Sequence, residues 1–337
     1  MAPTASRPGR LSPEESLVAS LIQLMEAGTA PWRRDWDSTG GGHHLNLISG
    51  RPYRGSNPVL LTLGMHLRGS SLPWWCGFAE AKARGLHPRR GCRAVHVLRP
   101  LRVPSREEGP PPQCAGGPGA DGETPRPRPA GIRFKPVAVF NAADLEGEAL
   151  GSLLAERRRA AAQTIRPEPE RLRTAEAVLR AWPVAVRHGG DRACYLPSLD
   201  RIHLPDRHAF HSAAALYATW AHEAIHSTGH PSRLGRDLSG SPAAGDAALK
   251  AYAREELVAE LGAVLLGDRL EIGSDGLNHA AYLSHWVELL RESPRLLLQV
   301  LGEARRAADL IAPERPAETA PDPHLGKAIA GDGAAGG

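Results

Sequence analysis

Residues 222–226, His-Glu-Ala-Ile-His, constrain this chain more than any other stretch. Histidines four residues apart project from one face of a helix and can bind one metal ion together. The surroundings favour a helix, with Ser212 as the predicted N-cap, alanines after it and Gly229 as the predicted stop. Glu223 lies beside the pair, placed to take a proton from water. This pattern is typical of zinc peptidases; the alternative is a surface histidine pair on an Ala-rich helix.

A catalytic zinc needs a third protein ligand. One class of zinc peptidases places a third histidine six residues after the second, but this chain has Ser232 there. His230 is an alternative candidate for the third ligand. The other common solution is a glutamate on a following helix, and residues 250–266 predict an amphipathic helix that carries Glu255, Glu256 and Glu260.

We predict that Glu256 is the third ligand and that Glu260, on the same face of the helix, accepts a hydrogen bond that orients one histidine. Glu255, about 100° round the helix, is the rival ligand. The alternative is that these acids form a solvated face with Arg254 and Lys250. Zn²⁺ is the expected ion, and Mn²⁺ or Co²⁺ also accept two histidines and a carboxylate.

The charge of the chain is unevenly spread. Residues 1–106 carry 15 Lys/Arg and 6 Asp/Glu, a net of +9, while the remainder carries −5. This predicts an anion-binding N-terminal domain beside an acidic one. The 4 cysteines show no CxxC pairing, which predicts a reduced cytoplasmic protein. The chain shows neither a signal-peptide core nor a stretch of membrane-span length, so we expect no membrane partner.

We predict an α+β protein of two domains: a small α/β domain and a mainly helical domain with a small sheet. The predicted divisions are a flexible arm at 1–11, the first domain at 12–147 with a disordered Pro/Gly-rich insertion at 104–131, the second domain at 148–312, and a disordered tail at 313–337. Helices are predicted at about 13–27, 57–67, 77–84, 148–163, 170–181, 277–291 and 294–311. Strands are predicted at 94–102, paired with 132–140, and at 183–187 and 192–203.

The basic N-terminal part also holds four of the seven tryptophans, including Trp32 and Trp36. Proteins bind single-stranded nucleic acid with this mixture of residues: cations contact the phosphates, and aromatic rings stack on the bases. The alternative is that the tryptophans lie in the core, where Trp32 and Trp36 hold their loop in place, and that the arginines are solvated.

Several segments resemble ArdC-type antirestriction proteins, whose N-terminal domain is shared by TraC-type plasmid primases. In the first half they are residues 28–36, 50–57, 78–82 and 139–147; in the second half they are residues 200–205, 222–226, 228–230, 233–234, the Glu255 segment, 279–282 and Trp286. The resemblance covers about residues 13–312. The chain departs from the family in its longer insertion and at Phe78, where many members have a Trp-Thr pair.

The resemblance implies a single-stranded-DNA-binding domain joined to a zincin-like metallopeptidase domain, in a mobile-element protein that protects incoming DNA from restriction. The second domain is also similar to SprT-like DNA-dependent proteases. The predicted DNA-binding residues are Trp32, Arg33, Arg34, Trp36, Arg51, Tyr53, Arg54, Asn57 and Lys82.

If a protein substrate is cut, residues 192–205 are expected to hold it as an added strand, and Tyr282 or His279 is a candidate to stabilise the oxyanion. Two alternatives stay open. One is a non-catalytic shield of single-stranded DNA with a structural metal, and the other is a DNA-dependent regulatory or repair protease.

Overall fold

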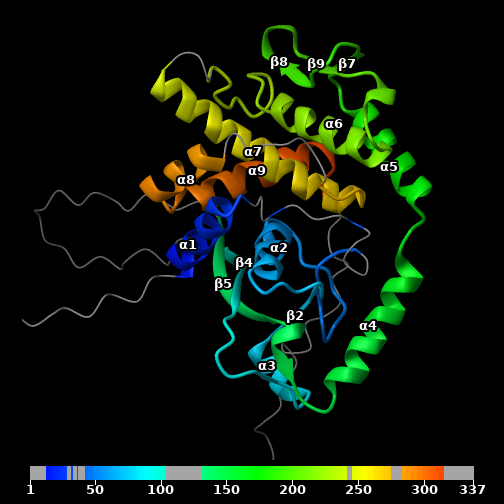
Figure 1. Ribbon diagram of the computed structural model, residues 1–337, viewed down its shortest axis with the longest axis vertical. Coiled ribbons are helices and arrows are strands. Elements are labelled where there is room, and N and C mark those ends of the chain that lie inside the picture. Colours follow the sequence, from blue (N-terminus) through cyan, green and yellow to red (C-terminus); the bar gives the residue numbers. More distant parts are fainter. Residues whose placement is uncertain are drawn as a thin grey trace, which may run out of the picture.

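The computed structural model describes residues 13–28, Trp32, Trp36, 42–103, 131–240, 245–274 and 283–314. The predicted arm at 1–11, nearly all of the predicted insertion and most of the tail lie outside these residues. The two-part, mixed α/β layout is confirmed. Figure 1 shows the two parts stacked, with helix α4 running along the side of the lower, N-terminal part and leading up to α5.

The N-terminal part is built on a four-stranded sheet of order β1-β2-β5-β4, in which β1 and β2 are parallel and the other pairs antiparallel. A second, two-stranded sheet pairs β3 with β6. The elements of this part are α1 (Pro13–Glu26), β1 (Leu45–Asn46), α2 (Asn57–His66), β2 (Trp74–Gly77), α3 (Phe78–Ala83), β3 (His87–Pro88), β4 (Val95–Val103), β5 (Gly131–Asn141), η1 (Ala142–Asp144) and β6 (Leu145–Glu146).

The C-terminal part is mainly helical and carries a three-stranded sheet of order β7-β9-β8. Its central helices are α6 and α7, which pack on each other below that sheet (Figure 1). The elements of this part are α4 (Leu150–Thr164), α5 (Glu168–Ala181), β7 (Ala185–His188), β8 (Cys194–Leu196), η2 (Pro197–Leu199), β9 (Arg201–Leu204), η3 (Arg207–Ala209), α6 (Ala213–Ser227), α7 (Asp246–Leu270), α8 (Leu283–Glu292) and α9 (Leu296–Ile311).

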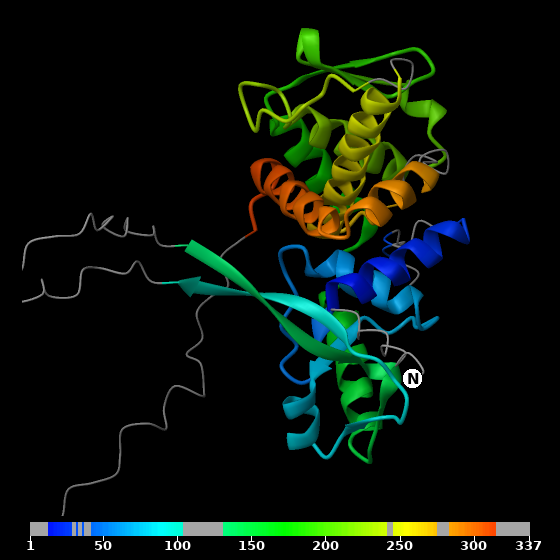
Figure 2. The ribbon, with the colours of Figure 1, turned by 90° about the vertical axis from the view of Figure 1, so that its left-hand side faces the viewer.

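Strands β4 and β5 form a long antiparallel ribbon, as the sequence predicts for 94–102 and 132–140. Figure 2 shows this twisted ribbon projecting from the body of the molecule. Its root is apolar, because Val95, Val97 and Val139 pack against α2 and β2. The Asn57 side chain bonds both backbone groups of Leu98, at 2.8 and 3.1 Å, and so fixes the ribbon to the start of α2.

The single strand predicted at 192–203 is wrong, because the segment folds into two antiparallel strands, β8 and β9. Pro197 has no N–H for a ladder and opens the short turn η2. Asp200 ends that turn in the left-handed region at φ 43°, a conformation that Asp tolerates better than most residues. The chain therefore reverses here, which leaves β8 at the edge of the sheet.

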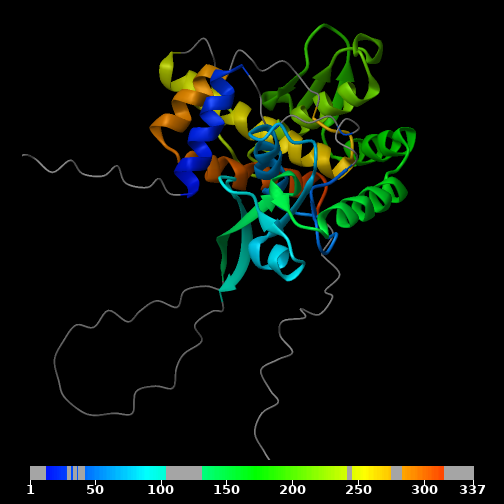
Figure 3. The same ribbon diagram turned by 60° about the horizontal axis from the view of Figure 1, so that its bottom comes forward.

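The two parts share one apolar core. Val18, Leu21 and Met25 of α1 and Leu60 of α2 belong to the same buried cluster as the inner faces of α6, α7, α8 and α9. Figure 3 shows α1 lying beside α8, and the two helices are in contact. None of the described helices combines the length and apolarity that crossing a membrane requires.

Two predicted segment boundaries lie near the edge of the described residues. Helix α8 is described from Leu283, and its predicted start near residue 277 lies outside the described residues. The predicted tail begins within the folded part, because the Glu314 carboxylate accepts the Gly55 N–H at 2.8 Å. Gly55 has φ 69°, the left-handed conformation that suits glycine at this turn.

Candidate metal site

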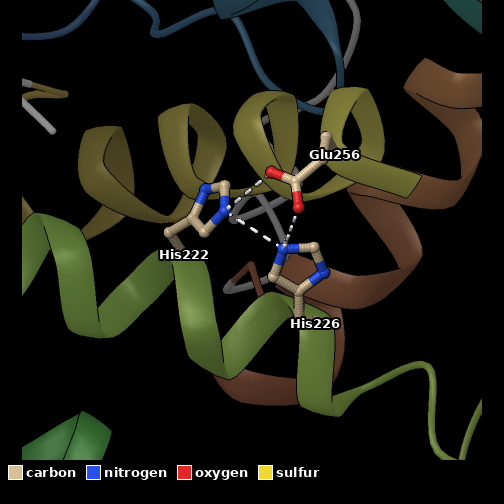
Figure 4. Close-up of side chains that lie close together, drawn as sticks. All are labelled: His222, His226 and Glu256. Atoms are coloured by element: carbon tan, nitrogen blue, oxygen red, sulfur yellow. Dashed lines mark hydrogen bonds and ion pairs between the residues drawn. The ribbon is translucent and has the colours of Figure 1, made fainter. Parts of the chain in front are cut away.

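Helix α6 presents the two histidines as the sequence predicts. Its N-cap is Ser212, whose hydroxyl oxygen accepts the Ala215 N–H at 3.0 Å, so that prediction is confirmed. One turn of helix separates His222 from His226, and their Nε2 atoms lie 3.1 Å apart. Their rings meet edge to face, with centroids 4.7 Å apart (Figure 4). Both rings therefore direct a nitrogen to the same point.

Helix α7 brings the carboxylate of Glu256 to that point. Its two oxygens lie 3.5 Å from the Nε2 atoms of His222 and His226, and one donor atom from each of the three residues lies within 4.8 Å of the others (Figure 4). Close packing of α6 on α7 permits this. A Cβ on Gly262 would lie 2.7 Å from Ile225, so a larger residue there would push the two helices apart.

The outer nitrogens of both histidines also face carboxylates of α7. Glu255, the rival ligand in the sequence, points to the other side of His226 and contacts its Nδ1 at 3.1 Å. Glu260 lies 3.8 Å from the Nδ1 of His222, at ion-pair distance but beyond a direct hydrogen bond. Sequence reasoning assigned the orienting role to Glu260 alone, whereas the structure gives Glu255 the closer contact of this kind.

Arg236 completes this outer layer, and sequence reasoning missed it. Its guanidinium donates to both oxygens of Glu255, at 2.9 and 2.8 Å, and also to the Ile225 carbonyl and the Thr228 hydroxyl. The side chain is only 6% exposed. A buried arginine in a loop after the motif helix has no sequence pattern of its own, because an arginine in a polar loop is ordinarily solvated.

Burial and charge shift the pKa values in opposite directions. Burial raises the pKa of Glu223, although His222 and His226 nearby oppose the shift. For Glu256, burial also acts upward, but contacts with the same two histidines outweigh it and hold the pKa below its usual range. Burial acts to lower the pKa of His226, yet its bonds to Glu255 and Glu256 raise it well above its ordinary value.

These side chains suit a divalent cation. Two imidazoles and one carboxylate are the donors that zinc and related ions take in catalytic sites. The carboxylates around the pair favour a positive charge between them, since they already stabilise a proton on His226. The outer carboxylates give each ring the partner that metal-binding histidines usually have.

The three residues open into a pocket of about 480 Å³. Glu223 also lines this pocket and is 4% exposed. Strand β8 contributes Cys194 and Tyr195 to its lining, and α7 contributes Tyr252 and Glu256. The site therefore combines a cluster that could hold a metal ion, a buried carboxylate and the edge of a sheet.

His230, the open third-ligand alternative, lies outside the cluster. Its Nδ1 contacts the Ser232 hydroxyl at 2.7 Å in the turn after α6. The two candidate oxyanion residues, His279 and Tyr282, lie outside the described residues.

The predicted DNA-binding residues are dispersed. Trp32 is 1% exposed and packs on Trp286, and Trp36 is 6% exposed and packs edge to face on His43. Indoles buried in this way cannot stack on a base, so the structure favours the alternative that they hold the loop. Asn57 is 9% exposed, and its amide serves the ribbon contact described above.

The remaining predicted residues show more surface. Arg51, Arg54 and Lys82 are exposed, Tyr53 is half-buried, and Arg33 and Arg34 lie outside the described residues. Phe78, which was not among the predicted residues, is 54% exposed and lies one helical turn before Lys82 on α3. The signal for it in the sequence was an aromatic residue four positions before a cation in a predicted helix.

The chain is similar to known proteins in both parts. Residues 13–140 match the N-terminal domain of anti-restriction factor ArdC, and residues 173–301 match a zincin-like metallopeptidase family. Two DNA primases named TraC from Escherichia coli are 34% and 32% identical over 88% of this chain. The chain spans only 27% and 20% of the length of those relatives. The uncharacterized protein y4eC of Sinorhizobium fredii (strain NBRC 101917 / NGR234) is 29% identical, over 88% of this chain and 90% of y4eC.

Two solved structures match over nearly their full length. The metal-free crystal structure of the antirestriction protein ArdC from plasmid R388 is 32% identical, with a TM-score of 0.61, over 88% of this chain and 96% of that one. The Mn(II)-bound structure of that protein is 30% identical, with a TM-score of 0.58, over 89% and 97%. This chain belongs to the ArdC family of antirestriction proteins.

Proposed function

We propose that this protein binds single-stranded DNA through its N-terminal domain and is a divalent-metal-dependent peptidase in its C-terminal domain, acting in a mobile element to protect incoming DNA. The observation that carries the peptidase proposal is the convergence of His222, His226 and Glu256 within 4.8 Å, in a pocket that Glu223 also lines. We propose Zn²⁺ as the ion. Mn²⁺ is the alternative, because the related R388 ArdC has a Mn(II)-bound structure.

In this proposal His222, His226 and Glu256 hold the ion. A divalent cation there supplies Lewis acidity, which lowers the pKa of water and polarises a peptide carbonyl. The Glu223 carboxylate takes a proton from the attacking water and returns it to the leaving amine. Burial raises the pKa of Glu223, which suits a general base that must afterwards act as an acid. Strand β8, at the edge of its sheet and in the wall of the pocket, offers backbone groups to an extended substrate peptide.

The test of the peptidase proposal is Glu223→Gln. The substitution keeps the shape of the side chain and removes its basicity, so metal content is expected to stay and proteolysis to be lost. Proteolysis at the wild-type rate would contradict the assignment. An antirestriction assay of the same variant separates the alternatives, because a shield that only coats DNA would keep its protective effect.

The DNA proposal rests on the exposed surface of α3. Phe78 offers an aromatic face, and Lys82 is one turn away, with exposed Arg84, Arg89 and Arg90 in the residues that follow. Base stacking on an aromatic side chain contributes about 1–3 kcal/mol per base. We therefore expect Phe78→Ala to weaken single-stranded DNA binding about 10-fold or more, measured by fluorescence anisotropy. Phe140→Leu, a change at a half-buried phenylalanine of β5, serves as a control for folding.

A further inference from the structure

The two histidines of the candidate metal site have similar surroundings, although only His226 has an outer carboxylate at hydrogen-bond distance. Each directs Nε2 toward Glu256 and faces a second carboxylate of α7 with Nδ1. That carboxylate is Glu255 for His226, at 3.1 Å, and Glu260 for His222, at 3.8 Å. A carboxylate on the outer nitrogen fixes the tautomer and orientation of a metal-binding imidazole and raises its basicity.

Each outer carboxylate has its own donor. Arg236 donates to both oxygens of Glu255. Trp32 donates its indole N–H to Glu260 at 3.0 Å. Arg236 lies in the loop that follows α6. Trp32 lies 228 residues before Glu260, in the segment between α1 and β1. One of the two supports of the site therefore comes from the N-terminal part of the chain.

The indole is held firmly in this position. Its ring packs on Trp286, with centroids 5.5 Å apart, and it is 1% exposed. Trp286 is fixed in turn, because its own N–H donates to the Ala253 carbonyl of α7 at 2.7 Å. A buried carboxylate such as Glu260, 5% exposed, depends on hydrogen-bond donors of this kind to stay in place.

We propose that Trp32 is a positioning residue of the metal site: it holds Glu260 against His222 in the way that Arg236 holds Glu255 against His226. The inference rests on the proposed divalent-metal site. Its consequence is that the N-terminal part of the chain completes a metal site whose ligands all lie in the C-terminal part. Loss of such an outer partner typically lowers metal affinity about 10- to 100-fold.

The test compares full-length Trp32→Phe with wild type. Phenylalanine keeps an aromatic ring against Trp286 and removes the N–H. Co²⁺ is titrated into each protein and its visible absorption followed, because intensity and position of the bands report ligand geometry. We expect Co²⁺ affinity to fall about 10-fold and the spectrum to change. Trp75→Phe is the matched control: Trp75 is also buried in the N-terminal part and its N–H bonds His44 at 3.2 Å, so the spectrum and affinity are expected to stay.

Glu260→Gln keeps Trp32 packed and provides a second variant if Trp32→Phe fails to fold. It is expected to lower Co²⁺ affinity, and the double variant should bind no more weakly than Glu260→Gln alone, because both changes break one chain of contacts. Co²⁺ binding by folded Trp32→Phe equal to that of wild type would overturn the role of Trp32, and equal binding by Glu260→Gln would overturn it as well. If wild type itself bound no Co²⁺, or bound it equally after His222→Ala, the proposed metal site would fail instead.

Discussion

At the scale of single residues, two carboxylates that line one pocket have opposite pKa shifts. Burial dominates at Glu223 and raises its pKa, while the two histidines dominate at Glu256 and lower it. When neighbouring acids lie in different environments, their pKa values separate. One site can then contain both a proton carrier and a group that stays charged. This difference supports the proposed division between Glu223 as base and Glu256 as ligand.

The choice between Glu256 and Glu255 as ligand leads to a prediction from a matched pair. Glu256→Gln should reduce Zn²⁺ binding far more than Glu255→Gln, because only Glu256 faces both Nε2 atoms. For Glu255→Gln we expect a loss of about 10- to 100-fold, typical of a partner behind a ligand. Competition with a chromophoric chelator measures both. A larger loss for Glu255→Gln would reverse the assignment.

At the scale of elements, β8 owes its place beside the pocket to a few contacts around the η2 turn. The Tyr195 hydroxyl donates to Asp200 at 2.8 Å, and Arg233, in the turn after α6, donates to the same carboxylate at 3.1 Å. Arg233 also donates to the Ser227 carbonyl at 2.7 Å. The edge strand is thus fastened to the end of the motif helix, which keeps the wall of the pocket at a fixed distance from the histidines.

Asp200 itself allows the backbone cost of this turn to be measured. Asp200→Ala and Asp200→Gly lose the same contacts, but alanine must adopt φ 43° against its preference. We expect Asp200→Ala to be less stable than Asp200→Gly by about 0.5–1 kcal/mol, since left-handed strain in alanine exceeds the extra unfolded-state entropy of glycine. Urea unfolding measures the difference. A more stable alanine variant would show that the turn relaxes when its side chain is removed.

At the scale of the whole molecule, the two family matches meet in one shared core, and polar contacts add to it. His43, in the segment before β1, bonds Asp268 of α7 at 3.1 Å and lies 3.6 Å from Glu271 at the end of that helix. Arg166, between α4 and α5 of the C-terminal part, bonds the same Glu271 at 2.9 Å. The His43 contact therefore joins the N-terminal part to α7 of the C-terminal part.

The His43 contact predicts a pH dependence of stability. Burial alone would lower the pKa of His43, but its bonds to Asp268 and Glu271 outweigh burial and raise the pKa from 6.5 to about 10. A group whose pKa is raised on folding stabilises the folded state. This stabilisation is fully present below pH 6.5 and is lost as the pH rises through about 10.

The stability gap between wild type and His43→Gln should therefore be largest near about pH 6 and shrink toward about pH 10. The side chain is 35% exposed, so water reduces the effect. Thermal unfolding across this range measures it, with the exposed His208→Gln as control. A gap that widened as pH rose would contradict the predicted contact.

Features that depend on local geometry were predictable from the order of the amino acids. Helical periodicity placed His222 and His226 on one face and predicted the N-cap at Ser212, because both depend only on residues within one or two turns. Apolar strand signals on both sides of the Pro/Gly-rich insertion likewise predicted the β4–β5 pairing. The reversal at Asp200 was missed, although Pro197, Ser198 and Asp200 are residue types common in turns, because the segment was treated as one strand.

Which of the three acids on α7 faces which histidine nitrogen became clear from the fold alone. Glu255, Glu256 and Glu260 share one helix, and their roles depend on how that helix is rotated against α6, which close packing at Gly262 allows. The same holds for Trp32. A tryptophan in a basic loop gives the same sequence pattern whether its indole stacks on a nucleic-acid base or donates to a buried carboxylate. Contacts between residues 228 positions apart are set by the packing of the whole core. A local sequence pattern contains no information about that packing.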